Sequence, residues 1–157
     1  MPKTAIPAFQ TEPLVMHPAL KVWPGEYDYI NIGGAGEITK FGVHIELLFK
    51  AAKSSLHHWH QAEDKIVYMP SSEFVLVEDD NTVLREGDTR LLASKTSQKP
   101  SFGKQEWGSD ASYLTVGTHN KQDVIHYSDH DLITHKEGKN RSYTHSEGSP
   151  FEKRNFK

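Results

Sequence analysis

The chain has 157 residues, a formal net charge of −3 and no cysteine. This length fits one domain with a single core, and the lack of cysteine excludes disulfides, cysteine-ligated zinc and thiol nucleophiles. The basic residues are scattered rather than clustered, which argues against a nucleic-acid partner. No apolar run approaches the length of a membrane span, and the N-terminus lacks the basic start and apolar core of a signal peptide. We therefore predict a cytoplasmic protein with no membrane partner.

Residues 1–25 contain five prolines. Proline does not support a helix interior or a central strand. We therefore predict an irregular N-terminal arm over this region, with at most one short edge strand near Leu14 and Val15.

Regular structure is predicted from the alternating run between Phe41 and Phe49. Apolar side chains at the odd positions alternate with Gly42, His44, Glu46 and Leu48, which is the period-two pattern of a strand with one buried face. If the odd positions face the packed core, His44 and Glu46 face either solvent or the interior of a barrel.

Further short strands follow at regular intervals, and no segment of helical length carries an apolar stripe at helical spacing. Turn residues separate the strands: Asp79-Asp80-Asn81 is typical of a hairpin turn, and Gly87-Asp88 is a second turn signal. Many short strands with regular turns indicate an all-β sandwich or barrel, which we place at residues 26–128. The other predicted strands are Ser54–His60, Ile66–Met69, Phe74–Val77, Thr82–Leu84, Arg90–Ala93, Tyr113–Val116 and Val124–Tyr127.

Two segments fit this pattern poorly. Lys95–Ser112 is polar and contains glycine, so it is either a loop or a weakly patterned pair of strands over the barrel mouth. Residues 129–157 are strongly polar, and we predict a C-terminal tail that lies on the barrel or on a partner subunit, or is partly disordered.

The ten histidines are the unusual feature of the composition, and Ser54–His60 holds the most informative of them. In an extended strand Leu56, His58 and His60 share one face, while His57 and Trp59 share the other. Two imidazoles at this spacing can aim at one point, either as metal ligands or as a proton-transfer pair. One buried and one solvated histidine would give the same spacing, so the pattern alone leaves these interpretations open.

The stretch from Ser54 to Tyr68 resembles the first conserved motif of small single-domain cupins, in which a His-Trp-His run is followed by an acidic cluster and a strand. Later segments are similar to the remaining strands of that family, so the resemblance covers most of the chain. It implies the cupin-type double-stranded β-helix barrel, or jelly roll. The similar segments are Phe41-Gly42-Val43, Phe74–Asp80, Val83–Asp88, Tyr113–Thr118, His126–Asp129 and Tyr143–Pro150.

The chain also departs from the family at its metal site. Cupins typically bind a divalent metal through two histidines and a glutamate of the first motif and a histidine of the second. The resemblance places Lys65 at the glutamate position, although Asp64 fits the shorter spacing that the motif allows. No histidine lies between His60 and His119, where the second motif is expected. The implied site is degenerate, with His58, His60 and Asp64 as candidate ligands for Zn, Fe, Ni or Mn. Gln98, Gln105, Glu106 and the histidines of the tail are further candidates to complete it.

Lys65 has two interpretations. If the family register holds, its ammonium points into the barrel beside His58 and His60, where it would bind a substrate carboxylate or polarise a carbonyl. Otherwise it is a solvated lysine at the barrel mouth, because lysine is rarely buried without a partner.

We therefore predict His58, His60 and Lys65 as catalytic residues and His44, Glu46 and Tyr68 as substrate-binding residues. The favoured function is a small-molecule enzyme that uses the histidine pair for acid–base chemistry (isomerisation, cyclisation, dehydration or decarboxylation) and requires no metal. The alternatives are a metal-dependent dioxygenase or isomerase and a non-catalytic binding barrel. A homodimer is expected, because an open sheet edge or an exchanged arm favours association.

Overall fold

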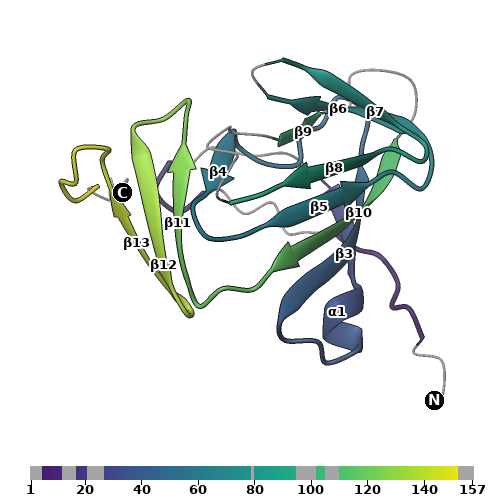
Figure 1. Ribbon diagram of the computed structural model, residues 1–157, viewed down its shortest axis with the longest axis horizontal. Coiled ribbons are helices and arrows are strands. Elements are labelled where there is room, and N and C mark those ends of the chain that lie inside the picture. The colour runs from purple at the N-terminus through teal and green to yellow at the C-terminus, as the bar shows by residue number, and fades with distance from the viewer. Residues whose placement is uncertain are drawn as a thin grey trace.

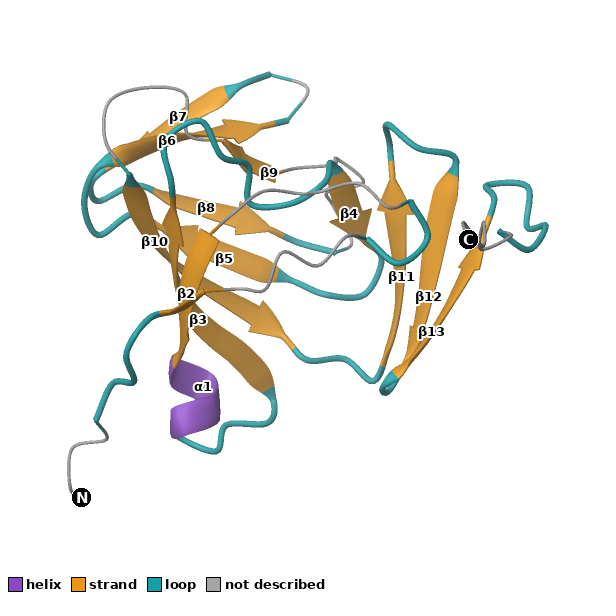
Figure 2. Ribbon diagram, turned by 180° about the vertical axis from the view of Figure 1, so that it is seen from behind, coloured by secondary structure: helices purple, strands orange, loops and turns teal. Residues whose placement is uncertain are grey.

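The computed structural model describes residues 5–11, 17–20, 27–78, 80–94, 102–104 and 110–151. Nearly every regular element in these ranges is a strand, which confirms the predicted all-β class (Figure 2). The elements are β1 (Gln10–Thr11), β2 (Tyr27–Asn31), α1 (Ile32–Ala35), β3 (Phe41–Leu48), β4 (His58–His60), β5 (Lys65–Tyr68), β6 (Glu73–Val77), β7 (Thr82–Arg85), β8 (Thr89–Leu92), β9 (Phe102–Lys104), β10 (Ala111–Thr118), β11 (Gln122–Tyr127), β12 (Leu132–Glu137) and β13 (Asn140–Thr144). Within the described ranges no helix is long and apolar enough to cross a membrane.

The strands form three antiparallel sheets that surround one interior (Figure 1). A six-stranded sheet has the order β1-β2-β3-β10-β5-β8, a three-stranded sheet has the order β7-β6-β9, and a four-stranded sheet has the order β13-β12-β11-β4. β10 lies between β3 and β5, although it is far from both of them in sequence. This crossing of distant strands gives the double-stranded β-helix arrangement.

The predicted turns are also found. β6 and β7 pair as an antiparallel hairpin, as the Asp80-Asn81 signal predicted; Asp79 lies outside the described residues. Between β7 and β8, Gly87 has φ +86°, a conformation that favours glycine. The Asp88 side chain accepts a hydrogen bond from the Arg85 backbone N–H at 2.8 Å, which closes this turn.

The core lies between the six-stranded and three-stranded sheets. The Phe74 ring is 1% exposed and stacks on the Tyr113 ring with centroids 4.9 Å apart. Burial of one such side chain contributes about 1.5–3 kcal/mol. The core cluster consists of Leu48, Val67, Met69, Phe74, Leu76, Leu84, Ala111 and Tyr113.

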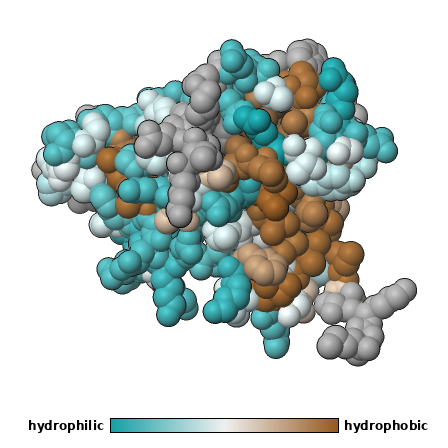
Figure 3. Space-filling view, in the orientation of Figure 1, coloured by the Kyte–Doolittle hydropathy of each residue, from teal (hydrophilic) through white to brown (hydrophobic). Residues whose placement is uncertain are grey.

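β3 shows which face of the six-stranded sheet points inward. Leu48 is fully buried and Gly42 is buried, whereas Phe41 is 42% exposed. The even positions of β3, including His44 and Glu46, therefore face the interior, and the apolar odd positions lie on the outer face. Figure 3 shows a broad apolar area over β3, β5 and β10. Its exposed members include Phe41, Ile66, Tyr68 and Leu91.

The C-terminal region differs from the predicted polar tail. Residues 132–144 form β12 and β13, which extend the sheet that contains β11 and β4. Leu132 and Thr134 are 1% and 3% exposed, so β12 has a buried face despite its polar sequence. The N-terminal arm contacts this sheet, because His17 Nε2 lies 3.1 Å from the Tyr127 hydroxyl. The predicted edge strand near Leu14 lies outside the described residues.

Candidate functional site

β4 places the two predicted histidines side by side. It pairs with β11 so that His58 lies opposite Tyr127 and His60 lies opposite Ile125. The two rings meet edge to face with centroids 5.0 Å apart, and their Nε2 atoms are 3.1 Å apart. The structure therefore brings both imidazoles to one point.

The opposite nitrogens of the two rings are held by acceptors. His58 Nδ1 lies 2.6 Å from the Leu56 carbonyl oxygen, and His60 Nδ1 lies 2.6 Å from Asp123 Oδ2. A carbonyl and an ionised carboxylate only accept, so both Nδ1 atoms carry the hydrogen. In two neutral imidazoles the facing Nε2 atoms are then both acceptors. At 3.1 Å such a pair is favourable only when a hydrogen or a cation lies between them.

Asp123 is the residue that orients His60. Its side chain is completely buried, and its Oδ1 accepts a hydrogen bond from the Ala62 backbone N–H at 2.9 Å. Burial by itself would raise the pKa of Asp123, but the hydrogen bonds from His60 and from the backbone N–H of Ala62 and Val124 lower it. The carboxylate therefore remains ionised beside His60.

The environment keeps His58 neutral. Burial, followed by the positive charge of Lys65 and then by His60, lowers the pKa of His58 from 6.5 to about 3. A proton on His58 at neutral pH would therefore cost roughly 5 kcal/mol. His58 accepts hydrogen bonds at Nε2 but is a weak base.

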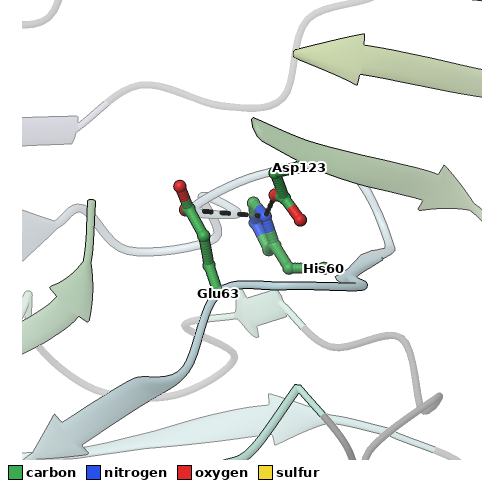
Figure 4. A group of neighbouring side chains, drawn as sticks. All are labelled: His60, Glu63 and Asp123. Atoms are coloured by element: carbon green, nitrogen blue, oxygen red, sulfur yellow. Dashed lines mark hydrogen bonds and ion pairs between the residues drawn. The ribbon is translucent and has the colours of Figure 1, made fainter. Parts of the chain in front are cut away.

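Asp64, the carboxylate predicted as a metal ligand, does not lie with the histidine pair. Asp64 is exposed, and its Oδ1 accepts a hydrogen bond from the Ser94 backbone N–H at 2.7 Å. Its neighbour Glu63 turns instead toward the site, with Oε2 3.7 Å from His60 Nδ1 and Oε1 in an ion pair with Lys136. Figure 4 shows Glu63 and Asp123 on either side of the His60 ring.

The described residues do not fit the metal site of the family. Among them no third His, Asp or Glu donor joins His58 and His60 within 4.8 Å; the potential ligand group that includes His60 consists of His60, Glu63 and Asp123. The carboxylates of that group approach Nδ1 of His60, on the side away from His58. Lys65 adds a positive charge where a ligand is expected. Gln98, Gln105 and Glu106 lie outside the described residues.

The other predicted site residues divide between the two faces of the sheet. Lys65 shares the inner face of β5 with buried Val67, and it is half-buried. His44 and Glu46 are on the inner face of β3. Glu46 accepts hydrogen bonds from the Tyr113 hydroxyl at 2.6 Å and the Thr115 hydroxyl at 2.9 Å.

Tyr68, predicted to bind substrate, lies on the outer face of β5 with Ile66 and is 38% exposed. The reason is the strand alternation, since Tyr68 is three residues from Lys65 and so points to the opposite face. The structure therefore does not place Tyr68 with the histidine pair.

The opposite face of β4 has a packing role. Trp59 stacks on His126 with ring centroids 3.9 Å apart and 4° between the planes. His57 pairs with Asp129 at 3.3 Å. These contacts follow the predicted alternation, which separates Trp59 and His57 from the site.

Sequence reasoning missed Asp123. It is 63 residues from His60, and no local motif joins the two. The one available signal was the alternation of side chains along β11. Asp123 lies two and four residues from Ile125 and Tyr127, the strand partners of His60 and His58, so its side chain is on the same face of the sheet as theirs.

Known structures resemble this chain over most of its length. A sugar phosphate isomerase of the cupin superfamily from Silicibacter pomeroyi is 28% identical, with 80% of each chain covered and a TM-score of 0.74. A putative sugar phosphate isomerase from Acidithiobacillus ferrooxidans is 17% identical, with 76% of each chain covered and a TM-score of 0.73. A cupin 2 conserved barrel domain protein from Rhodopseudomonas palustris is 10% identical, with 71% of this chain and 72% of that chain covered and a TM-score of 0.56.

No family model matches the sequence, and no curated protein matches it. The absence of a family-model match is consistent with the departures at Asp64, Lys65 and the second motif. The likeness to a member of the cupin superfamily that is 28% identical over 80% of both chains shows that this chain has the cupin fold and is related to that superfamily.

Proposed function

We propose that the protein is a small-molecule isomerase that transfers a proton with His60 and His58 and needs no metal ion for this step. The observation that carries the proposal is the facing pair of Nε2 atoms 3.1 Å apart, each ring fixed through Nδ1. This arrangement presents two adjacent acceptors to one bound substrate. The likeness to the sugar phosphate isomerase from Silicibacter pomeroyi supports isomerisation over the other reactions considered.

The two histidines have different tasks. His60 is the base, because Asp123 holds its Nδ1–H at 2.6 Å and stabilises the imidazolium that forms when Nε2 takes a proton. His58, with its pKa lowered to about 3, stays neutral and accepts a hydrogen bond from a substrate hydroxyl. The pair therefore combines one proton carrier with one orienting acceptor.

In the proposed reaction a carbon next to a carbonyl gives its proton to His60 Nε2. The electron pair moves to the carbonyl oxygen, and the ammonium of Lys65 stabilises the developing negative charge. The hydroxyl proton on the deprotonated carbon then passes to the former carbonyl oxygen, and His60 returns its proton to the former carbonyl carbon, so that the carbonyl moves by one position. All transferred atoms come from the substrate, so no co-reactant is needed.

The test is solvent deuterium incorporation. Aldose and ketose phosphates and the unphosphorylated sugars are incubated with metal-free protein in D₂O, and exchange at carbons 1 and 2 is followed by NMR. Wild-type protein treated with EDTA should catalyse exchange. The His60→Asn variant should lose about 10²–10⁴-fold of the rate, while His57→Asn, on the opposite face of β4, should retain it.

The remaining outcomes separate the alternatives. Exchange that EDTA abolishes and a divalent ion restores would establish the metal-dependent enzyme instead. Substrate binding without exchange in any of these sugars would support the non-catalytic barrel. Asp123→Asn should lower the rate and shift its pH profile, because the Asn amide no longer stabilises the His60 imidazolium; a packing role alone would leave the profile in place.

A further inference from the structure

Two glycines face each other on the inner side of the six-stranded sheet. Gly42 of β3 is the direct partner of Gly117 of β10, and Gly117 is in turn the partner of Lys65 of β5. The row across β3, β10 and β5 therefore consists of two glycines and Lys65, whose side chain is the one that projects over the sheet. Since neighbouring strands are about 4.8 Å apart, the Lys65 and Gly42 backbones are separated by roughly 10 Å.

Two imidazoles meet above Gly42. A Cβ atom at this position would lie 2.8 Å from His119 Nε2 and 3.1 Å from His44 Cε1. A Cβ here would force one of the rings to move, so glycine leaves room for both rings in the positions that they occupy. His119 follows β10 and is fixed by its backbone N–H, which donates to the Lys40 carbonyl at 3.1 Å.

The space above Gly117 is different. A Cβ there would contact one backbone atom, the Asp64 carbonyl oxygen, at 3.5 Å. That distance is ordinary van der Waals contact. As far as the described residues fill this region, the position between Lys65 on one side and the two imidazoles on the other is therefore open enough for a small group.

The groups around this position are donors that have no acceptor within the part of the chain that the structure describes. Among the residues that the structure describes, Lys65 forms no ion pair and the ring nitrogens of His44 and His119 form no hydrogen bond. The nearest carboxylate on the inner face of β3, Glu46, is already bound by the hydroxyls of Tyr113 and Thr115. An ammonium and two imidazole N–H groups around an open floor are suited to bind an anion.

We propose that Lys65, His44 and His119 form an anion-binding subsite over Gly117, adjacent to the histidine pair. The charge of Lys65 acts on His58, so Lys65 adjoins both sites. A bound molecule would place its anionic group over Gly117 and its reacting carbon at His60. This inference rests on the proposed function and narrows its substrates to small molecules that end in a phosphate or a carboxylate.

The experiment measures binding of inorganic phosphate and of acetate to the full-length protein by calorimetry and by the histidine signals in NMR. Wild-type protein should bind at least one of the two anions, and the stronger one identifies the terminal group. Gly117→Ala fills the space without a clash, and His119→Gln removes one donor. Each variant should weaken binding tenfold or more while the thermal midpoint stays within a few degrees of wild type.

A matched control is His135→Gln, which removes a histidine from β12, outside the subsite, and should leave anion binding unchanged. Equal binding by wild type, Gly117→Ala and His119→Gln would overturn the subsite, as would no binding of either anion at millimolar concentration. The anion-binding result is independent of the deuterium-exchange result that tests the isomerase proposal. Loss of anion binding in the variants of a protein that catalyses no deuterium exchange would retain the subsite and reject the isomerase.

Discussion

The two faces of the six-stranded sheet have opposite characters. The inner face of β3 carries Gly42, His44 and Glu46 before it reaches Leu48, whereas the outer face exposes apolar side chains such as Ile66 and Leu91. In most half-buried strands the polar face meets water. Here the polar face is enclosed, because it lines the barrel interior, where the candidate site lies beside the core.

The inner face is itself divided along the strands. At one end Leu48, Val67 and Tyr113 belong to the packed core. At the other end Gly42 and Lys65 belong to the candidate site. Alternation therefore identifies a strand, but it does not tell which face a closed sheet turns inward.

The largest expected effect tests the core end of the inner face. Leu48→Ala removes a fully buried side chain and should lower the free energy of unfolding by about 2–5 kcal/mol. Leu47→Ala, on the outer face and half-buried, should cost clearly less. Urea unfolding of both variants measures the difference, and equal losses would contradict the assignment of the faces.

The next effect tests the polar centre of the inner face. Tyr113→Phe deletes the hydroxyl that donates to Glu46 and leaves a half-buried carboxylate oxygen with one partner fewer, at a cost of about 1–3 kcal/mol. Tyr29→Phe is the control, since Tyr29 is the strand partner of Glu46 on β2. If both variants lose the same stability, the hydrogen bond to Glu46 does not stabilise the fold.

A pH effect sharpens the contrast between the enclosed histidine and the outer surface. The unfolded chain protonates His58 near pH 6.5, but the folded chain holds the pKa of His58 at about 3. Between these values the unfolded state binds more protons, so stability falls as pH decreases and is fully retained above about pH 6.5. The slope from this group reaches about 1.4 kcal/mol per pH unit.

Unfolding free energies at pH 7, 6 and 5 measure this slope. His58→Gln should reduce the slope but not abolish it, because burial also lowers the pKa of His17 and His126; a variant with the wild-type slope would show that His58 does not contribute. The lowered pKa of Asp123 acts in the same direction but only at more acidic pH, so the two contributions separate.

The smallest effect on stability is expected on the outer face. Leu91 is 67% exposed, so Leu91→Glu should change the unfolding free energy by about 0.5 kcal/mol or less.

The homodimer expected from the sequence remains a prediction, and two copies of this apolar face would cover each other. Light scattering should then give twice the chain mass for wild type and the single mass for Leu91→Glu. Lys139→Glu, in the turn after β12, is the control; equal mass for all three proteins would remove this face as the interface.

Much of the fold followed from local patterns. Period-two alternation and turn residues predicted β3, β5, β6, β7, β8, β10 and β11 within a few residues of their observed bounds, because strand geometry and turn conformation depend on neighbouring residues. β12 and β13 were missed. Their apolar residues are too few for a strand pattern, and β12 is held in the sheet by its pairing with β11.

The site was predictable only where one strand supplies it. The spacing of His58 and His60 by itself determined that both rings share a face, because side chains alternate along any extended strand. Which carboxylate orients His60 depended on the pairing of β4 with β11, and the choice of Asp123 over Asp64 has no local signal. The placement of Lys65, His44 and His119 around the two paired glycines likewise required β10 to lie between β3 and β5, and such pairing of distant strands is a property of the folded chain.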